Sequence, residues 1–282
     1  MLRRPSPSPV PSTLREPAAE PPFKKTPNYV QTLARGLDVI RAFDRDRPEM
    51  SLSEIAERVG LARAVVRRLL MTLEYLGFVG RRDRLFFLTP RTLELGYRYL
   101  ASLGLPELAH PLMRALADEV DESCSMSVLD GRDIVYVQRI PVRKVMAVTL
   151  TVGARLPAYC ASMGRVLLAG QSDAAVAAWL KGRRFPALTP FTLTDPAAIA
   201  AEIRRVREQG FARTEQEMEL GLCSVAVPVR DGTGCVIAAL NVGMPFREGA
   251  RDWMMEKVLP ALRVTSAAIT QSWAAAHPAR RP

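Results

Sequence analysis

Hydrophobic residues recur at every third or fourth position between Gly60 and Leu76. The spacing lines one face of a helix, and its members are Val66, Leu69, Leu70, Leu73 and Leu76. The opposite face carries Arg63, Arg67 and Arg68, whose like charges repel one another at this spacing. An anion bound on that face would remove the repulsion. The pattern therefore indicates either an ordinary solvated surface or a helix that enters a DNA groove.

The residues before this helix predict two others. A first helix, capped by Thr32, is predicted by an apolar stripe formed by Leu33, Leu37, Ile40 and Phe43. Ser51 followed three residues later by Glu54 is a capping box, so a second helix should begin at Leu52. Gly60 can adopt the positive φ of a tight turn, and it should end the second helix.

The residues after the basic helix predict a short β-hairpin. Phe78–Gly80 and Leu85–Leu88 are rich in strand-forming residues, and they flank a charged tip over 81–84. A capped helix, a glycine turn, a basic helix and a hairpin together indicate a winged helix-turn-helix. The arginines of the tip are either wing contacts to DNA or parts of a solvated loop, and they are Arg81, Arg82 and Arg84.

The rest of the chain alternates between helical and strand patterns. A run from Thr89 to Leu105 predicts a connecting helix. Further helices are expected over Glu107–Val120, from Asp195–Pro196 to Gly210, and over Asp252–Trp273 with a bend at Pro260. Strands are expected over Ser125–Leu129, Asp133–Ile140, Val145–Val152, Val225–Val229 and Val236–Val242. This order describes an α+β domain with a mostly antiparallel sheet.

Proline content and patterning together predict the domain boundaries. Eight prolines in the first 28 residues indicate a disordered tail. The expected organisation is a tail over 1–28, a winged helix-turn-helix over 29–90, a linker helix over 91–105, an effector domain over 106–275 and a second tail over 276–282.

The positive charge is concentrated in the N-terminal third. The chain has 282 residues and a net charge of +10, and its first 98 residues hold 18 Lys and Arg against 11 Asp and Glu. This asymmetry is typical of a polyanion-binding module joined to a nearly neutral one. No basic amphipathic helix with exposed aromatic residues favours a membrane surface instead.

The chemistry-bearing residues do not favour a metal site or an enzyme. The chain has no C-x-x-C pair, its only histidines are His110 and His277, and no glycine-rich phosphate loop is present. We therefore expect no metal and no cofactor. A hydrolase using Cys160 or Ser162 as nucleophile is a distant alternative, because Ser162 lies in ASMGR rather than in G-x-S-x-G. With no signal peptide or spanning segment, we expect a cytoplasmic protein with reduced thiols.

The sequence resembles the IclR family of bacterial transcription regulators from about Tyr29 to the last helix. The winged-helix segment is LARGLDVIRAFD followed by SLSEIAERVGLARAVVRRLLMTLEYLGFV. Two further segments are RLPAYCASMGRVLLA, from Arg155, and GFARTEQEMELGLCSVAVPVRD, from Gly210. The first two segments are most similar to the branch that controls catabolism of protocatechuate, 4-hydroxybenzoate and related aromatic acids.

The resemblance implies a regulator rather than an enzyme, with an effector domain related to GAF and PAS sheets. It implies a homodimer or tetramer that binds double-stranded operator DNA of an aromatic-acid operon of the β-ketoadipate pathway, and it leaves contact with RNA polymerase open. A small aromatic carboxylate would be the effector. A small aliphatic acid is the alternative, because Thr214 replaces an acidic or Ser position that lies in the effector pocket of other members. A second departure from the family signature is Arg230, which stands at an aromatic position.

The residue pattern and the family resemblance together indicate which residues contact DNA. The start of a recognition helix faces the major groove, so Arg63 and Arg67 should read guanine and Arg68 should bind phosphate. Ala62 and Ala64 stand where many members have Ser or Thr, which leaves the reading to the arginines.

The effector site is expected around a helix start. Ser162 and Met163 begin a helix whose free N–H groups favour a carboxylate. The resemblance adds other pocket positions, namely Val145, Leu156, Thr214, Leu222, Ser224 and Asn241. These residues are otherwise ordinary core and cap positions. Arg155 and Arg165 are either counter-ions for the acid or members of structural ion pairs.

Overall fold

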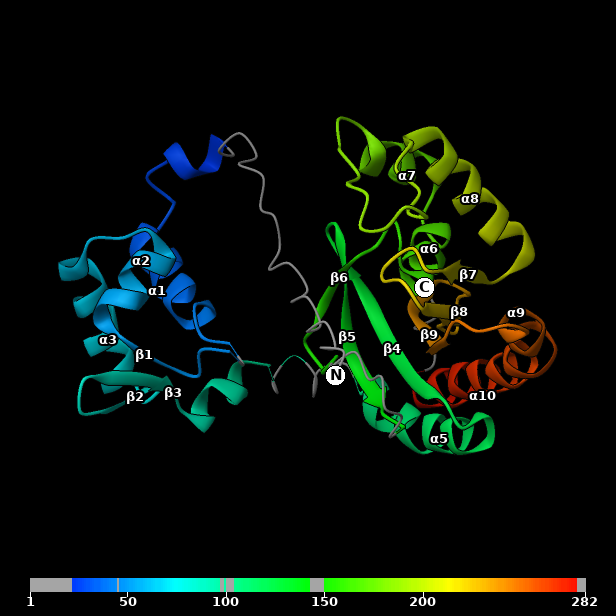
Figure 1. Ribbon diagram of the computed structural model, residues 1–282, viewed down its shortest axis with the longest axis horizontal. Coiled ribbons are helices and arrows are strands. Elements are labelled where there is room, and N and C mark those ends of the chain that lie inside the picture. Colours follow the sequence, from blue (N-terminus) through cyan, green and yellow to red (C-terminus); the bar gives the residue numbers. More distant parts are fainter. Residues whose placement is uncertain (1–21, 45, 97–98, 100–103, 143–149, 278–282) are drawn as a thin grey trace, which may run out of the picture. The chain divides into compact units, whose positions relative to one another are not determined.

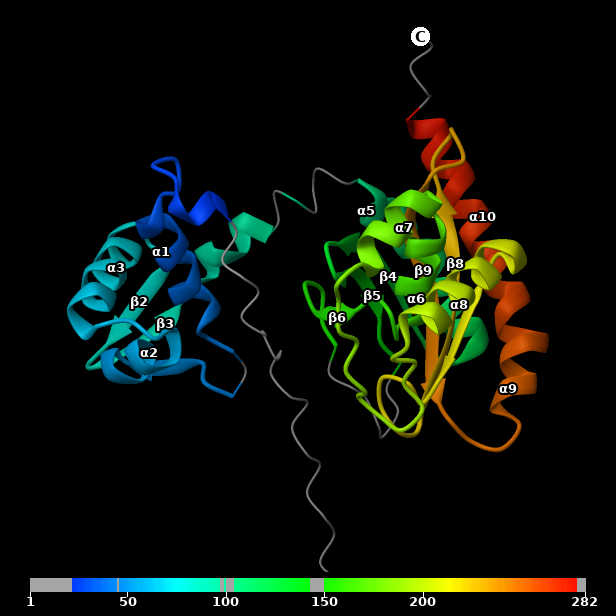
Figure 2. The same ribbon diagram turned by 90° about the horizontal axis from the view of Figure 1, so that it is seen from above.

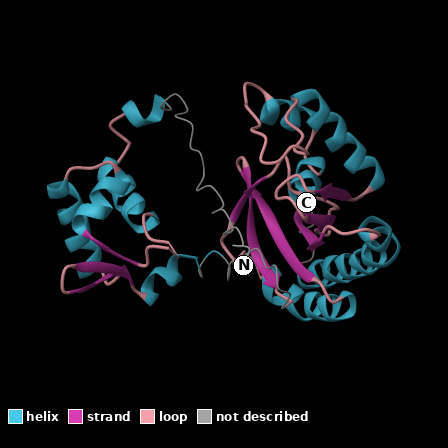
Figure 3. Ribbon diagram, viewed as in Figure 1, coloured by secondary structure: helices cyan, strands magenta, loops and turns pink. Residues whose placement is uncertain are grey.

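A computed structural model describes residues 22–44, 46–96, 99, 104–142 and 150–277. The chain divides into two compact units, which comprise residues 1–95 and 96–282 (Figure 1). Each unit has its own helices and its own sheet (Figure 3). No helix among the described residues is long and apolar enough to cross a bilayer.

The N-terminal unit is a winged helix-turn-helix. Its elements are a 3₁₀ turn η1 (Pro22–Lys25), α1 (Gln31–Arg41), β1 (Glu49–Ser51), α2 (Leu52–Val59), α3 (Arg63–Tyr75), β2 (Val79–Arg82) and β3 (Leu85–Leu88). The strands form an antiparallel sheet in the order β1-β3-β2. The core beneath them is apolar and includes Val39, Ile55, Val66 and Leu70.

The capping box and the turn form as predicted. The Ser51 backbone N–H donates to Glu54 Oε2 at 2.7 Å, and the Glu54 N–H donates to Ser51 Oγ at 3.4 Å. Gly60 has a φ of 65° and ends α2. Ser51 is thus a helix cap, as the sequence predicted.

Three local predictions in this unit were wrong. Val30, not Thr32, precedes the first turn of α1, and no side chain caps that helix. Arg81 and Arg82 belong to β2, so the hairpin tip is narrower than expected and turns at Asp83, whose φ is 54°. Strand β1 was missed because three residues are too short to show a period of two.

The connection to the second unit is less regular than a single helix. A 3₁₀ turn η2 (Pro90–Thr92) follows Thr89, and residues 93–96 are helical. Gly104 has a φ of 61°, which interrupts the predicted helix just before α5 (Leu105–Val120). Residues 97, 98 and 100–103 of the expected linker lie outside the described residues.

The C-terminal unit is built on a six-stranded antiparallel sheet in the order β6-β5-β4-β9-β8-β7. The strands are β4 (Ser123–Asp130), β5 (Asp133–Ile140), β6 (Arg155–Pro157), β7 (Ala212–Glu215), β8 (Leu222–Arg230) and β9 (Val236–Pro245). The helices after α5 are α6 (Ser162–Ala169), α7 (Asp173–Leu180), α8 (Pro196–Gln209), α9 (Ala250–Trp253), a π turn η3 (Met254–Val258) and α10 (Leu259–Ala276).

Helices cover both sides of this sheet (Figures 1 and 2). We call the side against α5 and α10 the α10 face, and the side against α6, α7 and α8 the α6 face. The α10 face is packed with larger apolar side chains, including Met126, Val227 and Leu240. The α6 face presents small residues such as Ala226 and Ala239.

A glycine lets α6 lie close to the preceding loop. A Cβ added at Gly164 would lie 2.1 Å from the carbonyl oxygen of Ala158, a distance that side chains do not tolerate. This close packing fixes the start of α6 against the loop that precedes it. Packing alone therefore explains the glycine of the ASMGR segment, and no catalytic role of the segment is needed to explain it.

The sheet differs from the expected one at its edges. Most of the predicted strand Val145–Val152 lies outside the described residues, and Leu150–Val152 is not strand. Strands β6 and β7 were missed because each has only three or four residues. The last helical run is continuous from α9 through η3 into α10, and the π turn η3 ends two residues before Pro260, whose missing N–H cannot donate within the helix.

Candidate DNA-binding helix and effector site

Helix α3 presents a basic surface with no acidic partner. Its inner face is buried at Val66, Leu69, Leu70 and Leu73. Arg63, Ala64, Arg67 and Arg68 are exposed. Within the described chain, no carboxylate lies within 4.0 Å of the three guanidinium groups. Their charges are therefore free to meet an external anion, as a DNA-reading helix requires.

The wing arginines are held differently. Arg81 Nε lies 3.5 Å from Glu74 Oε1, and Arg82 Nη1 lies 3.3 Å from Glu49 Oε1. The Arg82 guanidinium also lies over the ring of Phe87, 5.6 Å from its centroid. Arg84 has no acid within 4.0 Å among the residues described. Arg84 is thus the wing cation with the most freedom to bind a phosphate.

Three hydroxyl groups meet on the α6 face. Ser162 Oγ lies 2.8 Å from Ser224 Oγ, which lies 3.0 Å from Thr214 Oγ1. We call these three residues the hydroxyl cluster. They come from the start of α6, from β8 and from β7, where Thr214 and Ser224 are direct cross-strand partners. The structure therefore brings together three residues far apart in the sequence.

The N-terminus of α6 lies at this cluster. Ala161 precedes the helix and offers no side-chain cap, so the first N–H groups have no side-chain acceptor. Ser162 and Met163 are almost completely buried. Uncapped N–H groups at a helix start favour oxygen atoms of a ligand.

Two buried polar atoms on the α6 face lack partners. Asn241 lies on β9 between Ser125 of β4 and Ala226 of β8. Neither Asn241 Oδ1 nor Ser127 Oγ makes a hydrogen bond to any residue that the structure describes. A buried polar atom without a partner is costly, so a donor such as water or a ligand hydroxyl is expected there.

The apolar site candidates are more scattered. Met163 packs in the same apolar cluster as Leu156, which lies on edge strand β6. Leu222 begins β8, two residues before Ser224, and is half-buried. Val145 lies outside the described residues. The polar candidates for the effector site therefore lie closer together in the structure than the apolar candidates do.

The two arginines considered as counter-ions are already paired. Arg165 is 1% exposed, and its two terminal nitrogens donate to Glu217 at 2.7 and 2.5 Å. Arg155 donates to Asp130 at 2.6 Å and to Asp133 at 3.2 Å. Both are therefore structural ion pairs, and their charges are not available to an effector.

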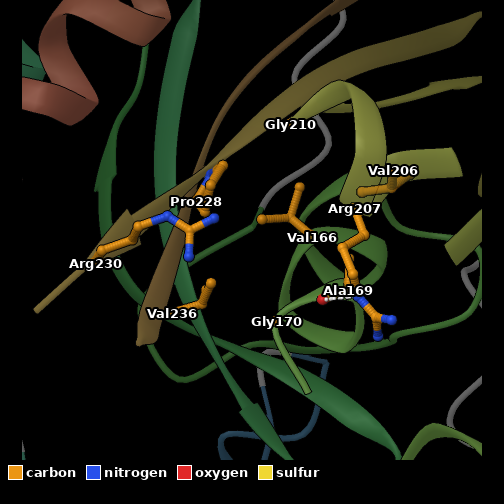
Figure 4. Close-up of a pocket in the computed structure, with 9 residues that line it drawn as sticks. All are labelled: Val166, Ala169, Gly170, Val206, Arg207, Gly210, Pro228, Arg230 and Val236. Carbon is orange, nitrogen blue, oxygen red and sulfur yellow. Dashed lines mark hydrogen bonds between the residues drawn. The ribbon is translucent and has the colours of Figure 1, made fainter. Parts of the chain in front are cut away.

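A small cavity lies at the opposite end of α6 from the hydroxyl cluster (Figure 4). It has a volume of about 30 Å³ and lies among side chains of α6, α8, β8 and β9. Arg207 closes one side by donating to the carbonyl of Ala169, and Arg230 donates to Gly234. The volume suits one or two water molecules and is far below that of a ligand pocket.

Cys160 has no activated environment. Burial raises the pKa of its thiol to about 12, which keeps the group protonated at neutral pH. The partners of Cys160 Sγ in the described chain are Pro157 O and Met218 Sδ, whereas His110 contacts Gln138 and His277 stacks on Trp273. The arrangement does not supply the base that a cysteine nucleophile needs.

The sequence reasoning missed part of the polar surface. Ser125 and Ser127 lie on the α6 face of β4, whereas Cys124 and Met126 lie on the α10 face. The signal was present in the run SCSMS, in which serine alternates with buried apolar residues. This alternation directs the serines to one face of the strand. Polar side chains that are buried on one face need hydrogen-bond partners, which a bound ligand can supply.

Comparison with known proteins identifies the family. The IclR helix-turn-helix domain matches residues 32–83, and the C-terminal domain of bacterial IclR transcriptional regulators matches residues 97–271. The chain belongs to the IclR family of bacterial transcriptional regulators. It thus combines a DNA-binding winged helix with an effector-binding domain, and its relatives are regulators rather than enzymes.

Two of the most similar curated relatives are regulatory proteins. The Pca regulon regulatory protein of Pseudomonas putida is 40% identical over 245 residues, which span 86% of this chain and 84% of that protein. The p-hydroxybenzoate hydroxylase transcriptional activator of Acinetobacter baylyi is 34% identical over 247 residues, spanning 86% of this chain and 91% of that protein.

Solved structures share the fold over nearly their whole length. A putative transcriptional regulator from Rhodococcus sp. RHA1 has a TM-score of 0.80 and 46% identity, with coverage of 88% of this chain and 100% of that one. An IclR homolog from Microbacterium hydrocarbonoxydans, complexed with 4-hydroxybenzoate, has a TM-score of 0.77 and 26% identity, with coverage of 86% and 99%.

Proposed function

We propose that this protein regulates transcription of an operon for aromatic-acid catabolism, in response to a small aromatic carboxylate bound on the α6 face. The operon would serve degradation of protocatechuate or 4-hydroxybenzoate through the β-ketoadipate pathway. The observation that carries the proposal is the hydroxyl cluster at the start of α6, in a chain 40% identical to a Pca regulon regulatory protein. As a bacterial transcriptional regulator, it would act in the cytoplasm.

The DNA contacts are proposed from the free charges of α3. Arg63 and Arg67 would make bidentate contacts to guanine, and Arg68 would bind a phosphate. Ala64, exposed between them, would contact a thymine methyl group. In the wing, Arg84 would bind the backbone, with Arg81 and Arg82 contributing less because each already has an acidic neighbour.

The effector contacts are proposed from the two kinds of side chain on the α6 face. The hydroxyl cluster and Asn241 would bind the polar substituents of the acid. The apolar candidates Leu156, Met163 and Leu222 would surround the ring. Aromatic acids present both an apolar ring and polar ends, which a pocket of this composition matches.

Regulation would follow from different effector affinities in two arrangements of the DNA-binding units. A homodimer or tetramer binds paired half-sites, and a ligand that favours one spacing shifts the population toward it. A contact with RNA polymerase would allow the protein to activate transcription, whereas without such a contact it would repress transcription by blocking the promoter.

Thermal unfolding of the full chain with a panel of acids tests the proposed function. The panel is 4-hydroxybenzoate, protocatechuate, cis,cis-muconate and glyoxylate at equal concentrations. We expect the unfolding temperature to rise with an aromatic acid, since a ligand that binds only the folded state stabilises it. A rise with glyoxylate alone would contradict the aromatic assignment and favour the aliphatic alternative.

A further inference from the structure

Arg139 lies on the α6 face, near the polar groups just described. It is opposite Ser125 in the pairing of β5 with β4, and its Nη1 donates to Ser125 Oγ at 3.2 Å. Its neighbour Ile140 packs on the α10 face, so alternation along the strand directs Arg139 to the other side. The guanidinium therefore reaches over β4 toward the middle of the sheet.

The charge of Arg139 has no acidic partner among the described residues. Within the described chain, no carboxylate lies within 4.0 Å of its guanidinium. Burial lowers the pKa of Arg139 and leaves the group charged at neutral pH. Arg155 and Arg165, by contrast, each have carboxylates at hydrogen-bonding distance. A partly buried cation without a counter-ion is unfavourable, and an incoming anion would remove that cost.

The neighbours of Arg139 extend this surface toward the middle of the sheet. Ser125 is the direct partner of both Arg139 and Asn241, so one cross-strand row holds a cation, a hydroxyl and an amide. Adjacent strands lie about 4.8 Å apart, which places Asn241 one strand beyond the point that the guanidinium reaches. Ser127, two residues along β4, adds a second buried oxygen without a partner.

We propose that Arg139 is the residue that makes the effector site select carboxylates. It binds the carboxylate of the effector through charge-assisted hydrogen bonds, and Ser125 positions its guanidinium. The hydroxyl cluster and Asn241 then hold the opposite, uncharged end of the ligand. This inference rests on the proposed effector site. It places the carboxylate of the effector beside β5, whereas the sequence had suggested the start of α6 as the carboxylate site.

Calorimetric titration of the full chain tests this assignment with two ligands of the same shape. The ligands are 4-hydroxybenzoate and its neutral analogue 4-hydroxybenzamide. For the natural sequence we expect the acid to bind about 10- to 100-fold more tightly than the amide. In Arg139→Met this preference should be lost, through weaker binding of the acid and little change for the amide. Arg139→Lys, which keeps the charge, should retain part of it.

Arg155→Met is the matched control, because it removes a guanidinium from the same unit whose charge is already paired with Asp130 and Asp133. We expect it to keep the preference for the acid. Equal preference in Arg139→Met and the natural sequence would overturn the assignment while leaving the proposed function intact. Loss of the preference in Arg155→Met alone would overturn it as well. Binding of neither compound by the natural sequence would overturn both the assignment and the site.

Discussion

At the residue scale, the effector site depends on a few polar side chains with unequal partners. The three hydroxyls of the hydroxyl cluster share two hydrogen bonds, which leaves at least one O–H free to donate to a ligand, and Asn241 Oδ1 has no donor among the described residues. Arg139 has a hydroxyl but no acid. A site whose buried groups are incompletely satisfied without ligand gains free energy when the ligand supplies the missing partners. The missing hydrogen-bond and charge partners are therefore the physical basis for the proposed preference for carboxylate ligands.

Ser224→Ala should weaken effector binding because Ser224 links Ser162 to Thr214. Loss of the central hydroxyl removes two hydrogen bonds, and we expect about 1–3 kcal/mol of lost stability. Affinity for 4-hydroxybenzoate, measured by calorimetry, should fall as well. Ser266→Ala is a matched control, since that hydroxyl donates to Pro228 O at 2.6 Å from α10. It should lose stability but keep the affinity; an equal loss of affinity in both variants would contradict the account.

Thiol reactivity provides a second test at this scale. Burial raises the pKa of Cys124, Cys160 and Cys223 to about 12, so these thiols stay protonated and slow to react at pH 8, and their reactivity should rise only toward pH 12. Cys235 is exposed. Titration of the native protein with a disulfide reagent should give one fast thiol, which Cys235→Ser removes. Fast modification of Cys160 would indicate an activated cysteine and revive the nucleophile hypothesis.

The sequence suggested polar candidates for the effector site but not their arrangement. Ser162 was expected from a helix start, and Thr214 and Ser224 from the family resemblance, but their contact depends on β7 pairing with β8 and on α6 packing across both. Arg139 was missed because an arginine at the end of a strand carries no local signal of burial. Its lack of an acid is a property of the folded sheet, which periodicity does not report.

At the scale of elements, the longer periodic segments and the hairpin of β2 and β3 were predicted, whereas the other short strands were not. Helix α3, with four buried positions, and the hairpin of β4 and β5 were both expected. The strands β1, β6 and β7 have three or four residues each, and their structure is imposed by β3, β5 and β8. Tertiary pairing decides the state of such short segments.

Ser51→Ala should destabilise the N-terminal unit by about 1 kcal/mol, because it removes the side-chain half of the capping box of α2. The free energy of unfolding of that unit, followed by urea denaturation, measures the effect. Ser53→Ala, two residues along the same helix, serves as the control. Equal stability of the two variants would show that the cap contributes nothing.

Arg67→Ala should lower affinity for specific DNA by about 1–3 kcal/mol, because an exposed, unpaired guanidinium on α3 would contact a base edge. Fluorescence anisotropy at fixed salt, with a duplex that the protein selects from a randomised pool, gives the affinity. Arg251→Ala removes an exposed arginine from α9 of the other unit and should leave affinity nearly unchanged. Undiminished binding by Arg67→Ala would remove this residue from the contact surface.

At the scale of the whole molecule, the two units carry different chemistry. The N-terminal third holds most of the excess positive charge, and the unpaired arginines of α3 lie in it. The other unit holds buried hydroxyl, amide and guanidinium groups on one face of its sheet. A regulator needs a free-energy coupling between two such sites, and that coupling is reciprocal.

The coupling itself is the most direct test of the central claim. Affinity of the full chain for its selected DNA duplex should be measured by anisotropy at one salt concentration, with increasing 4-hydroxybenzoate. The account predicts a saturable change in DNA affinity of about 5- to 150-fold, which is absent with 4-hydroxybenzamide at the same concentrations. DNA affinity that stays constant at every concentration of 4-hydroxybenzoate and protocatechuate would contradict it.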